Sequence, residues 1–348
     1  MDGIPITARD QANRALLGGL YPEDLNDFNN PSDALGESQS TIKARLIGMS
    51  DLATRLDGKS VTGDIDPNDQ FQHTPGSAVA GTPYLILFDD LDQGKWVLSL
   101  GNPDTAQTIV MTVGGVGRGL NDWLYQDLSN NDALYGAILK AGSDPADVAA
   151  IIWIGYDAPS TILDLTKIPP WPTLDQAVAA APSFALFQSG LIVTHQNGGM
   201  VPHITVIGHS YGTDVVAETT LNGNSLVADD IVLIGCPGVP VANTSALTQN
   251  TATSSRKPAP AQVWASVTGH DYLTLIVHPL GTWPIPPDFG AFDFASDPQG
   301  DHGGYWEGSG LSNMANIALA RYDQVTPFST PPAVTPSAGP TAIQPSPT

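Results

Sequence analysis

The stretch His203-Ile204-Thr205-Val206-Ile207-Gly208-His209-Ser210-Tyr211-Gly212-Thr213-Asp214-Val215-Val216 decides how the rest of the chain is interpreted. A β-branched, apolar run leads into Gly-His-Ser-Tyr-Gly, a G-x-S-x-G pattern, and residues that can form a helix follow. A serine between a strand and a helix, with glycines that let the two elements approach closely, is the layout of a nucleophile elbow. The pattern predicts that Ser210 is held above the edge of a sheet. The alternative is a glycine-rich turn in which this serine only caps the helix.

The residues after Ser210 supply an acid and a base in the chain order that such an elbow requires. A serine hydroxyl is a weak nucleophile, so it needs a base within hydrogen-bond reach and an acid that orients the base. Asp271 follows a predicted strand and is the expected acid. We predict that the base is His302, which lies in a glycine-flanked loop before the last predicted helix. The alternative base is His278, which is less favoured because it is close to Asp271 in sequence and precedes a proline. Asp297 and Asp301 are the alternative acids.

An oxyanion formed at the serine would need two backbone N–H donors. One is expected from Tyr211, directly after the serine, and the other from the loop Gly114-Gly115-Val116-Gly117, which ends an earlier predicted strand. We assign the second donor to Val116, with Gly115 as the next candidate. The loop could instead be a simple tight turn, whereas its glycine spacing does not match a phosphate-binding G-x-G-x-x-G pattern. His209, on the elbow itself, is expected to point away from the serine.

Two proline-rich aromatic segments are candidates for a substrate pocket. They contain Trp171, Trp283 and Phe289 and are expected at the carboxyl ends of the strands, where ligands bind in open α/β folds. Capping of the core is an equally good interpretation of these side chains. Cys236 follows a strand without an evident histidine partner, so we interpret it as a small buried residue rather than a nucleophile.

Strands and helices alternate after an expected hairpin at residues 84–100, which predicts a doubly wound, mostly parallel α/β sheet. We expect a main domain at residues 82–322, with residues 1–60 as a helical preface packed on it. Residues 326–348 are rich in Pro, Ser and Thr and are expected to be a disordered tail.

The preface contains two helical patterns, and a polar segment follows it. The first helix, from Thr7 to Leu20, is expected to stop at Gly18-Gly19, and the second covers Leu35 to Leu56. Residues 58–81 are interpreted as a polar hinge, and the stretch within it that contains Asp64, Asp66 and Asn68 as a solvated turn. Their acidic residues lack the glycine and glutamate that a calcium loop needs, so we predict no metal and no cofactor.

Composition restricts the class of partner. The 348 residues include 13 Lys and Arg against 35 Asp and Glu, a formal net charge of -22. Such a surface repels phosphate backbones, so we expect a neutral or hydrophobic small molecule and no nucleic acid. We find no apolar run approaching the roughly 18 residues of a membrane span and no secretory leader, so no integral membrane association is expected. The cytoplasm is the default location, with export by another route left open, and the oligomeric state is not predicted.

Several blocks of the chain together resemble the actinobacterial α/β-hydrolase family catalogued as a domain of unknown function. The resemblance extends from Asp2 to about Tyr322 and implies a serine-hydrolase fold with Ser210 as the elbow serine. The chain has glycine at 114 and cysteine at 236 where the family usually has proline and serine. The blocks are Asp2-Gly3-Ile4-Pro5, Arg9-Asp10-Gln11-Ala12-Asn13-Arg14, Gly101-Asn102-Pro103-Asp104-Thr105-Ala106, Trp153-Ile154-Gly155-Tyr156-Asp157-Ala158-Pro159, Gly208-His209-Ser210-Tyr211-Gly212 and Ala228-Asp229-Asp230-Ile231-Val232-Leu233-Ile234-Gly235-Cys236-Pro237-Gly238.

These observations predict a serine hydrolase, of the esterase or lipase-like kind, that acts on a small or lipid-like ester through an acyl-enzyme. Ser210, Asp271 and His302 form the expected triad. A non-catalytic α/β-hydrolase scaffold that binds a partner is the alternative from another class. An amidase or thioesterase would use the same triad, so the sequence does not separate these from an esterase.

Overall fold

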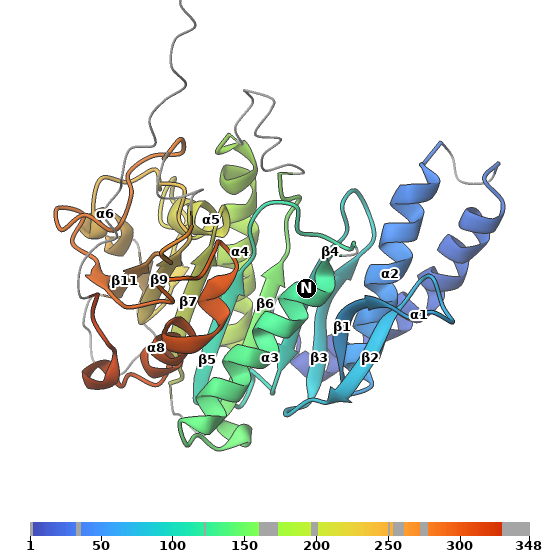
Figure 1. Ribbon diagram of the computed structural model, residues 1–348, viewed down its shortest axis with the longest axis horizontal. Coiled ribbons are helices and arrows are strands. Elements are labelled where there is room, and N and C mark those ends of the chain that lie inside the picture. Colours follow the sequence, from blue (N-terminus) through green and yellow to red (C-terminus); the bar gives the residue numbers. More distant parts are fainter. Residues whose placement is uncertain are drawn as a thin grey trace, which may run out of the picture.

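The computed structural model describes residues 3–32, 36–121, 123–159, 173–195, 201–249, 251–252, 261–271 and 278–328. Within them the main sheet has eight strands in the order β12-β11-β9-β7-β5-β6-β4-β3 (Figure 1). Its strands are β3 (Pro83–Asp89), β4 (Lys95–Leu100), β5 (Thr108–Val113), β6 (Val148–Ile154), β7 (His203–His209), β9 (Asp230–Ile234), β11 (Gln262–Ser266) and β12 (Phe292–Asp293). The helices are α1 (Ile6–Asn29), α2 (Gln39–Leu56), α3 (Leu124–Lys140), α4 (Asp175–Thr194), α5 (Gly212–Glu218), α6 (Thr244–Thr248) and α8 (Gly308–Ala318).

The sheet is parallel from β12 to β6 and antiparallel at its other end, where β4 pairs with β6 and with β3. The predicted hairpin is confirmed as β3 and β4, and the prediction of a doubly wound, mostly parallel sheet is confirmed. The central strand β7 lies between β5 and β9 and is buried from Ile204 to its last residue. Burial on both faces explains why these strands are nearly continuous apolar runs.

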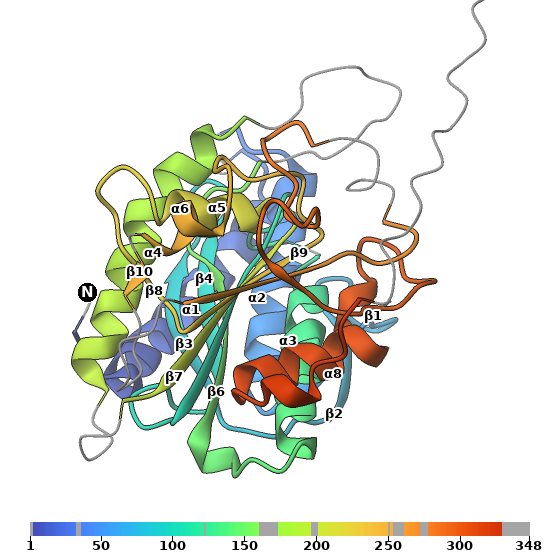
Figure 2. The ribbon, with the colours of Figure 1, turned by 90° about the vertical axis from the view of Figure 1, so that its left-hand side faces the viewer.

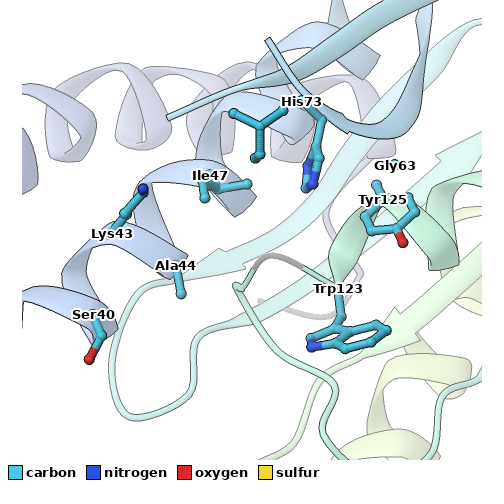
Figure 3. Close-up of a pocket in the computed structure, with 9 residues that line it drawn as sticks. Ser40, Lys43, Ala44, Ile47, Gly63, His73, Trp123 and Tyr125 are labelled. Carbon is cyan, nitrogen blue, oxygen red and sulfur yellow. The ribbon is translucent and has the colours of Figure 1, made fainter. Parts of the chain in front are cut away.

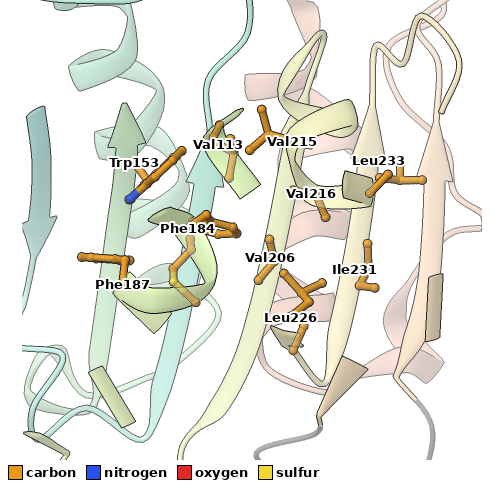
Figure 4. Packing of buried hydrophobic residues seen from close by; sticks show 14 of the residues in the cluster. Val113, Trp153, Phe184, Phe187, Val206, Val215, Val216, Leu226, Ile231 and Leu233 are labelled. Carbon is orange, nitrogen blue, oxygen red and sulfur yellow. The ribbon is translucent and has the colours of Figure 1, made fainter. Parts of the chain in front are cut away.

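Helices cover both faces of the sheet, as Figure 2 shows with α4 and α5 on one side and α3 and α8 on the other. The first face buries Phe184 and Phe187 of α4 against Val206 of β7 and Trp153 of β6 (Figure 4). The second face packs α3 and α8 against the opposite sides of the same strands. Because the end of β7 lies between two buried layers, residues that follow it directly have little freedom to move.

Helix α1 covers the otherwise free edge of the sheet at β3. Its Asp10 carboxylate accepts a hydrogen bond from the backbone N–H of Leu85 at 2.7 Å. The side-chain amide of Asn13 donates to the carbonyl of Leu85 at 2.9 Å, and the Arg9 guanidinium donates to the carbonyl of Ile86 at 3.1 Å. Side chains of α1 therefore take the place of a further strand and satisfy backbone groups that would otherwise be free for edge-to-edge pairing.

The predicted end of α1 is wrong. The helix continues past Gly18-Gly19 and through Pro22 to Asn29. The two glycines have open space around them, so they cost only propensity, on the order of 1 kcal/mol each. The later turns of α1 pack on Ile42 and Leu46 of α2, and this tertiary contact outweighs the propensity.

The segment interpreted as a polar hinge, residues 58–81, instead contains a hairpin of β1 (Lys59–Ile65) and β2 (His73–Ala78), with turns between the two strands. Its strands have few buried residues, so they lack the alternation that marks a strand in sequence. Contacts with α2 and α3 supply the packing that the hairpin cannot provide alone.

The expectation about apolar runs also needs correction. Among the described residues one helix, α4, has an 18-residue window that is long and apolar enough to cross a membrane, by length and composition only. Scattered polar residues and a proline hide this run when the sequence is scanned for uninterrupted apolar residues. Half of that window is buried within the structure, as expected for a helix on a sheet. Most of the expected tail, residues 329–348, lies outside the described residues.

We expect the substitution Asp10→Ala to destabilise the fold by about 1–3 kcal/mol, because it leaves the backbone N–H of Leu85 without its acceptor. Urea denaturation of the two proteins measures this difference in free energy of unfolding. Gln11→Ala is the matched control, because Gln11 is exposed on the same helix. Equal unfolding midpoints for Asp10→Ala and Gln11→Ala would contradict the proposed protection of the β3 edge.

Candidate active site

Ser210 follows β7 directly and lies in a strained backbone conformation. Its φ angle is 56°, in the left-handed region that non-glycine residues rarely adopt. The backbone N–H of Ser210 donates to the carbonyl of Ile234 at 3.0 Å, and its own carbonyl accepts from the backbone N–H and the hydroxyl of Thr213. Three hydrogen bonds therefore hold the turn from both sides and offset a conformational cost of about 1–2 kcal/mol.

The glycines of the G-x-S-x-G pattern are required by close contacts between backbone segments. A Cβ atom at Gly212 would lie 2.1 Å from the carbonyl oxygen of Val113 at the end of β5. A Cβ atom at Gly208 would lie 2.6 Å from the Cα atom of Thr213. Both neighbours are backbone atoms, so no side-chain rotation could relieve the overlap. The structure has the strand-to-helix geometry of a nucleophile elbow around Ser210.

Asp271 and His302 come together although 31 residues separate them. The Nδ1 atom of His302 lies 2.9 Å from each carboxylate oxygen of Asp271. The Nε2 atom of His302 is buried and has no hydrogen-bond partner among the described residues. With a proton on Nδ1 for the carboxylate, a neutral ring carries its lone pair on Nε2, the atom that a general base would use.

The Asp271 carboxylate is fully buried, and a second side chain also holds it. The Tyr305 hydroxyl donates a hydrogen bond to Asp271 Oδ2 at 2.5 Å. Burial acts to raise the pKa of Asp271, but the hydrogen bonds and charge of His302, together with the Tyr305 hydroxyl, outweigh it, so the pKa is lowered below its ordinary value. The carboxylate therefore stays ionised and keeps the His302 ring oriented.

The residue pair Ile234-Gly235 brings Ser210 and His302 to the same place. The carbonyl of Ile234 accepts from the Ser210 backbone, while a Cβ atom at Gly235 would lie 3.0 Å from His302 Cε1. Gly235 has a φ of +57°, so its glycine provides both the turn and the space for the imidazole. This role of Gly235 is not among the expectations from the sequence, although a glycine directly after a buried apolar strand is a signal for it.

The glycine loop after β5 lies against the serine. A Cβ atom at Gly115 would lie 2.8 Å from Ser210 Cβ and 3.2 Å from Ser210 Oγ. The Tyr156 hydroxyl donates to the carbonyl of Gly114 at 2.8 Å and so holds this loop. The backbone N–H groups of Val116 and Tyr211 make no hydrogen bond within the described part of the chain. Within the described ranges both expected oxyanion donors are therefore unpaired, one directly after Ser210 and the other in the loop whose Gly115 contacts Ser210.

His209, which is expected to point away from the serine, contacts His302. Its ring centroid lies 5.0 Å from that of His302, and its Nε2 atom lies 2.9 Å from the carbonyl oxygen of His302. Burial, followed by the neighbouring His302, lowers the pKa of His209 to about 3, so the ring is neutral. Since a carbonyl only accepts, the Nε2–H of His209 donates this hydrogen bond and fixes the backbone of His302.

The remaining candidates have different surroundings. His278, the alternative base, is stacked on Trp283, with ring centroids 4.7 Å apart. The expected acid, Asp271, contacts His302. Phe289 is buried in the main core. Trp171 lies outside the described residues.

Cys236 is buried, and the Thr213 hydroxyl contacts its sulfur at 3.3 Å. Burial raises the pKa of the Cys236 thiol, which favours the interpretation as an inert packed residue. No group of three or more His, Cys, Asp or Glu side chains within the described ranges is arranged to hold a metal ion.

Comparison with known proteins identifies the family. A sequence profile described as alpha/beta hydrolase matches residues 89–279, which is more than half of the chain. The chain therefore belongs to the alpha/beta hydrolase family, and the fold class and family resemblance inferred from the sequence are confirmed.

Two relatives of the chain are mycobacterial proteins described as uncharacterized. A protein of Mycobacterium tuberculosis is 29% identical over 258 residues, which are 71% of this chain and 36% of that protein. A protein of Mycobacterium bovis is 31% identical over 171 residues, which are 47% of this chain and 60% of that protein. The chain thus spans less than two thirds of the length of either relative. Among solved structures, an esterase named PE8 aligns with a TM-score of 0.41 and 16% identity over 64% of this chain and 96% of the esterase.

We expect Gly212→Ala to unfold the protein or to destabilise it by roughly 3 kcal/mol or more, because its methyl group would overlap the carbonyl of Val113. Thermal melting gives the change in Tm. Gly136→Ala within α3 is the control, because nothing lies within 4 Å of a Cβ atom there, and we expect it to be stabilising by about 1 kcal/mol. A Gly212→Ala variant as stable as wild type would contradict the close contact at the elbow.

We expect Tyr305→Phe to cost about 1.5–3 kcal/mol of stability at neutral pH, because Asp271 loses a hydrogen bond to its charged form. A carboxylate whose pKa is lowered by folding contributes stability above its unfolded pKa, near 4, and loses this contribution as the pH falls through its lower folded value. The difference between Tyr305→Phe and wild type should therefore shrink in urea unfolding below about pH 4.

Tyr84→Phe provides the control for Tyr305→Phe, because the Tyr84 hydroxyl has no hydrogen-bond partner in the described part of the chain. Tyr84→Phe should leave the free energy of unfolding nearly unchanged at neutral pH and below about pH 4. A deficit for Tyr305→Phe that stays equally large at low pH would show that the loss does not act through the ionised Asp271.

Proposed function

We propose that this protein is a serine carboxylic ester hydrolase of the esterase or lipase-like kind. The observation that carries the proposal is the His302 ring, which is held through Nδ1 by buried Asp271 while its buried Nε2 has no partner among the residues that the structure describes. The ring lies on Gly235, next to the residue that anchors the Ser210 backbone. This arrangement supports Ser210 as a nucleophile activated by His302.

In the proposed reaction Ser210 Oγ attacks the ester carbonyl while His302 Nε2 takes the serine proton. Asp271 stabilises the resulting imidazolium, and the N–H groups of Tyr211 and Val116 hold the oxyanion. His302 then gives its proton to the leaving alcohol, and an acyl-enzyme remains on Ser210. Water, deprotonated by His302, attacks the acyl carbonyl, the bond to Ser210 Oγ breaks, and His302 returns the proton to Ser210 Oγ as the carboxylic acid product leaves.

The charge and the geometry also support a substrate class. A formal net charge of -22 disfavours anionic substrates at the surface, so a neutral or hydrophobic ester is the expected substrate. Trp283 remains a candidate for the acyl side of the pocket, whereas the burial of Phe289 in the core supports a structural role. The buried, neutral His209 and the Tyr305 hydroxyl are proposed to hold the base and acid in position.

We expect Ser210→Ala to reduce hydrolysis of a short-chain aryl ester by at least about a thousandfold, because the nucleophile is lost. Initial rates measure the loss, and a fluorophosphonate probe that labels wild type should fail to label the variant. Ser189→Ala is the matched control, since this serine is exposed on α4 and bonds only the helix backbone. A folded Ser210→Ala variant with wild-type activity would contradict the proposal. If the folded wild-type protein neither hydrolyses esters nor reacts with the probe, the result would favour a non-catalytic scaffold.

A further inference from the structure

A cavity of about 520 Å³ lies on the side of the molecule formed by the N-terminal helices (Figure 3). It is enclosed by α2, by the β1 and β2 hairpin and by the beginning of α3. Its volume lies within the range of pockets that bind small molecules. None of its lining residues belongs to the elbow, to the glycine loop or to the segments that carry Asp271 and His302. The lining residues are Ser40, Lys43, Ala44, Ile47, Gly63, Ile65, His73, Trp123 and Tyr125.

The walls of the cavity are largely apolar and aromatic, and part of this surface is exposed. Trp123 is 53% exposed and Ile65 is 42% exposed, although both are large hydrophobic side chains. They line the same hollow as Ile47 of α2 and the ring of Tyr125. Single exposed apolar side chains are common, but a group that shares one concave surface is typical of a binding site.

One cation, Lys43, also lines this cavity. It forms no ion pair within the part of the chain that the structure describes, whereas Arg45 on the same helix is bound by Asp24 and Glu37. Asp64 lies between the lining residues Gly63 and Ile65 on β1 and is not itself among the lining residues. The formal net charge of -22 repels anions over the surface as a whole. Against that background, the Lys43 ammonium beside the apolar hollow supplies a local attraction for a negatively charged group of a ligand.

The inner end of the cavity is preformed. His73 is buried and its Nδ1 atom lies 2.8 Å from Asp51 Oδ2, which fixes the orientation of the ring. The His73 ring also contacts the Tyr125 ring at 4.7 Å between centroids. A Cβ atom at Gly63 would lie 3.1 Å from Tyr125 Cε2, so glycine leaves the aromatic ring its place. A ligand would therefore meet ordered side chains and lose little free energy in arranging them.

We propose that this cavity is a second ligand site, separate from the ester-hydrolysing site, and that it takes a small amphiphilic anion. The apolar or aromatic body of the ligand packs against Ile47, Ile65 and Trp123. Its carboxylate or sulfonate lies at the Lys43 ammonium. This inference does not depend on the activity of Ser210, because it concerns binding at residues that take no part in that reaction.

The test compares an anionic and a neutral probe of similar shape, anilinonaphthalene sulfonate and phenylnaphthylamine, by fluorescence titration of the full chain. Lys43→Gln should raise the dissociation constant of the sulfonate about tenfold and leave that of the amine unchanged, since only the anion loses a charge partner. Ala44→Phe should weaken both probes at least about tenfold, because it fills the cavity. Lys140→Gln is the matched control, since Lys140 lies roughly 22 Å along α3 from Tyr125.

Melting temperatures establish that each variant is folded before the titrations are compared. Selective weakening of the sulfonate by Lys43→Gln, with both probes weakened by Ala44→Phe, supports the site. If Lys43→Gln leaves the sulfonate affinity unchanged, or if Ala44→Phe leaves both affinities unchanged, the proposal is overturned. An equal effect of Lys140→Gln would show that only the overall charge matters and would also overturn it.

Discussion

The contact between the elbow and its neighbouring strand is the constraint on which the active-site side of this structure depends. Gly212 has no Cβ atom, so the start of α5 approaches the last carbonyl of β5, where a methyl group would lie 2.1 Å from oxygen. This approach fixes the position of the loop that follows β5, and Gly115 of that loop then lies against Ser210. The strained φ of Ser210 is maintained because the layers on both sides of β7 are buried. A single pair of glycines thus determines where a nucleophile and its oxyanion loop could meet.

The parts of the fold that could be predicted from the sequence are those in which local pattern and final burial agree. Strands β5, β6, β7 and β9 are continuous apolar runs because they are covered on both faces. The length of α1 and the β1 and β2 hairpin could not be predicted, because both depend on distant partners. Helix α1 continues through Gly18-Gly19 because α2 packs on its later turns, and no residue near those glycines carries that information.

The site shows the same division between local and distant information. Ser210, Asp271 and His302 could be proposed from a motif and from chain order, because the fold imposes that order on the strands that carry them. Tyr305 and Gly235 act through contacts with residues more than 30 positions away, so no local pattern marks them. Their positions were nevertheless restricted, since Tyr305 follows His302 in the same loop and Gly235 ends the strand next to β7.

The N-terminal helix α1 protects an edge of the sheet, a role that the sequence motifs alone do not indicate. The block Arg9-Asp10-Gln11-Ala12-Asn13-Arg14 belongs to the family resemblance, yet it lies far from Ser210 in sequence. Its polar side chains bind backbone groups of β3, so the pattern reflects protection of a sheet edge rather than catalysis. Helix α2 packs on α1, and its other contacts include β1 and the cavity around Lys43. Helix α1 thus covers the edge of the sheet directly and supports the proposed anion site through its packing on α2, so loss of α1 would disturb both.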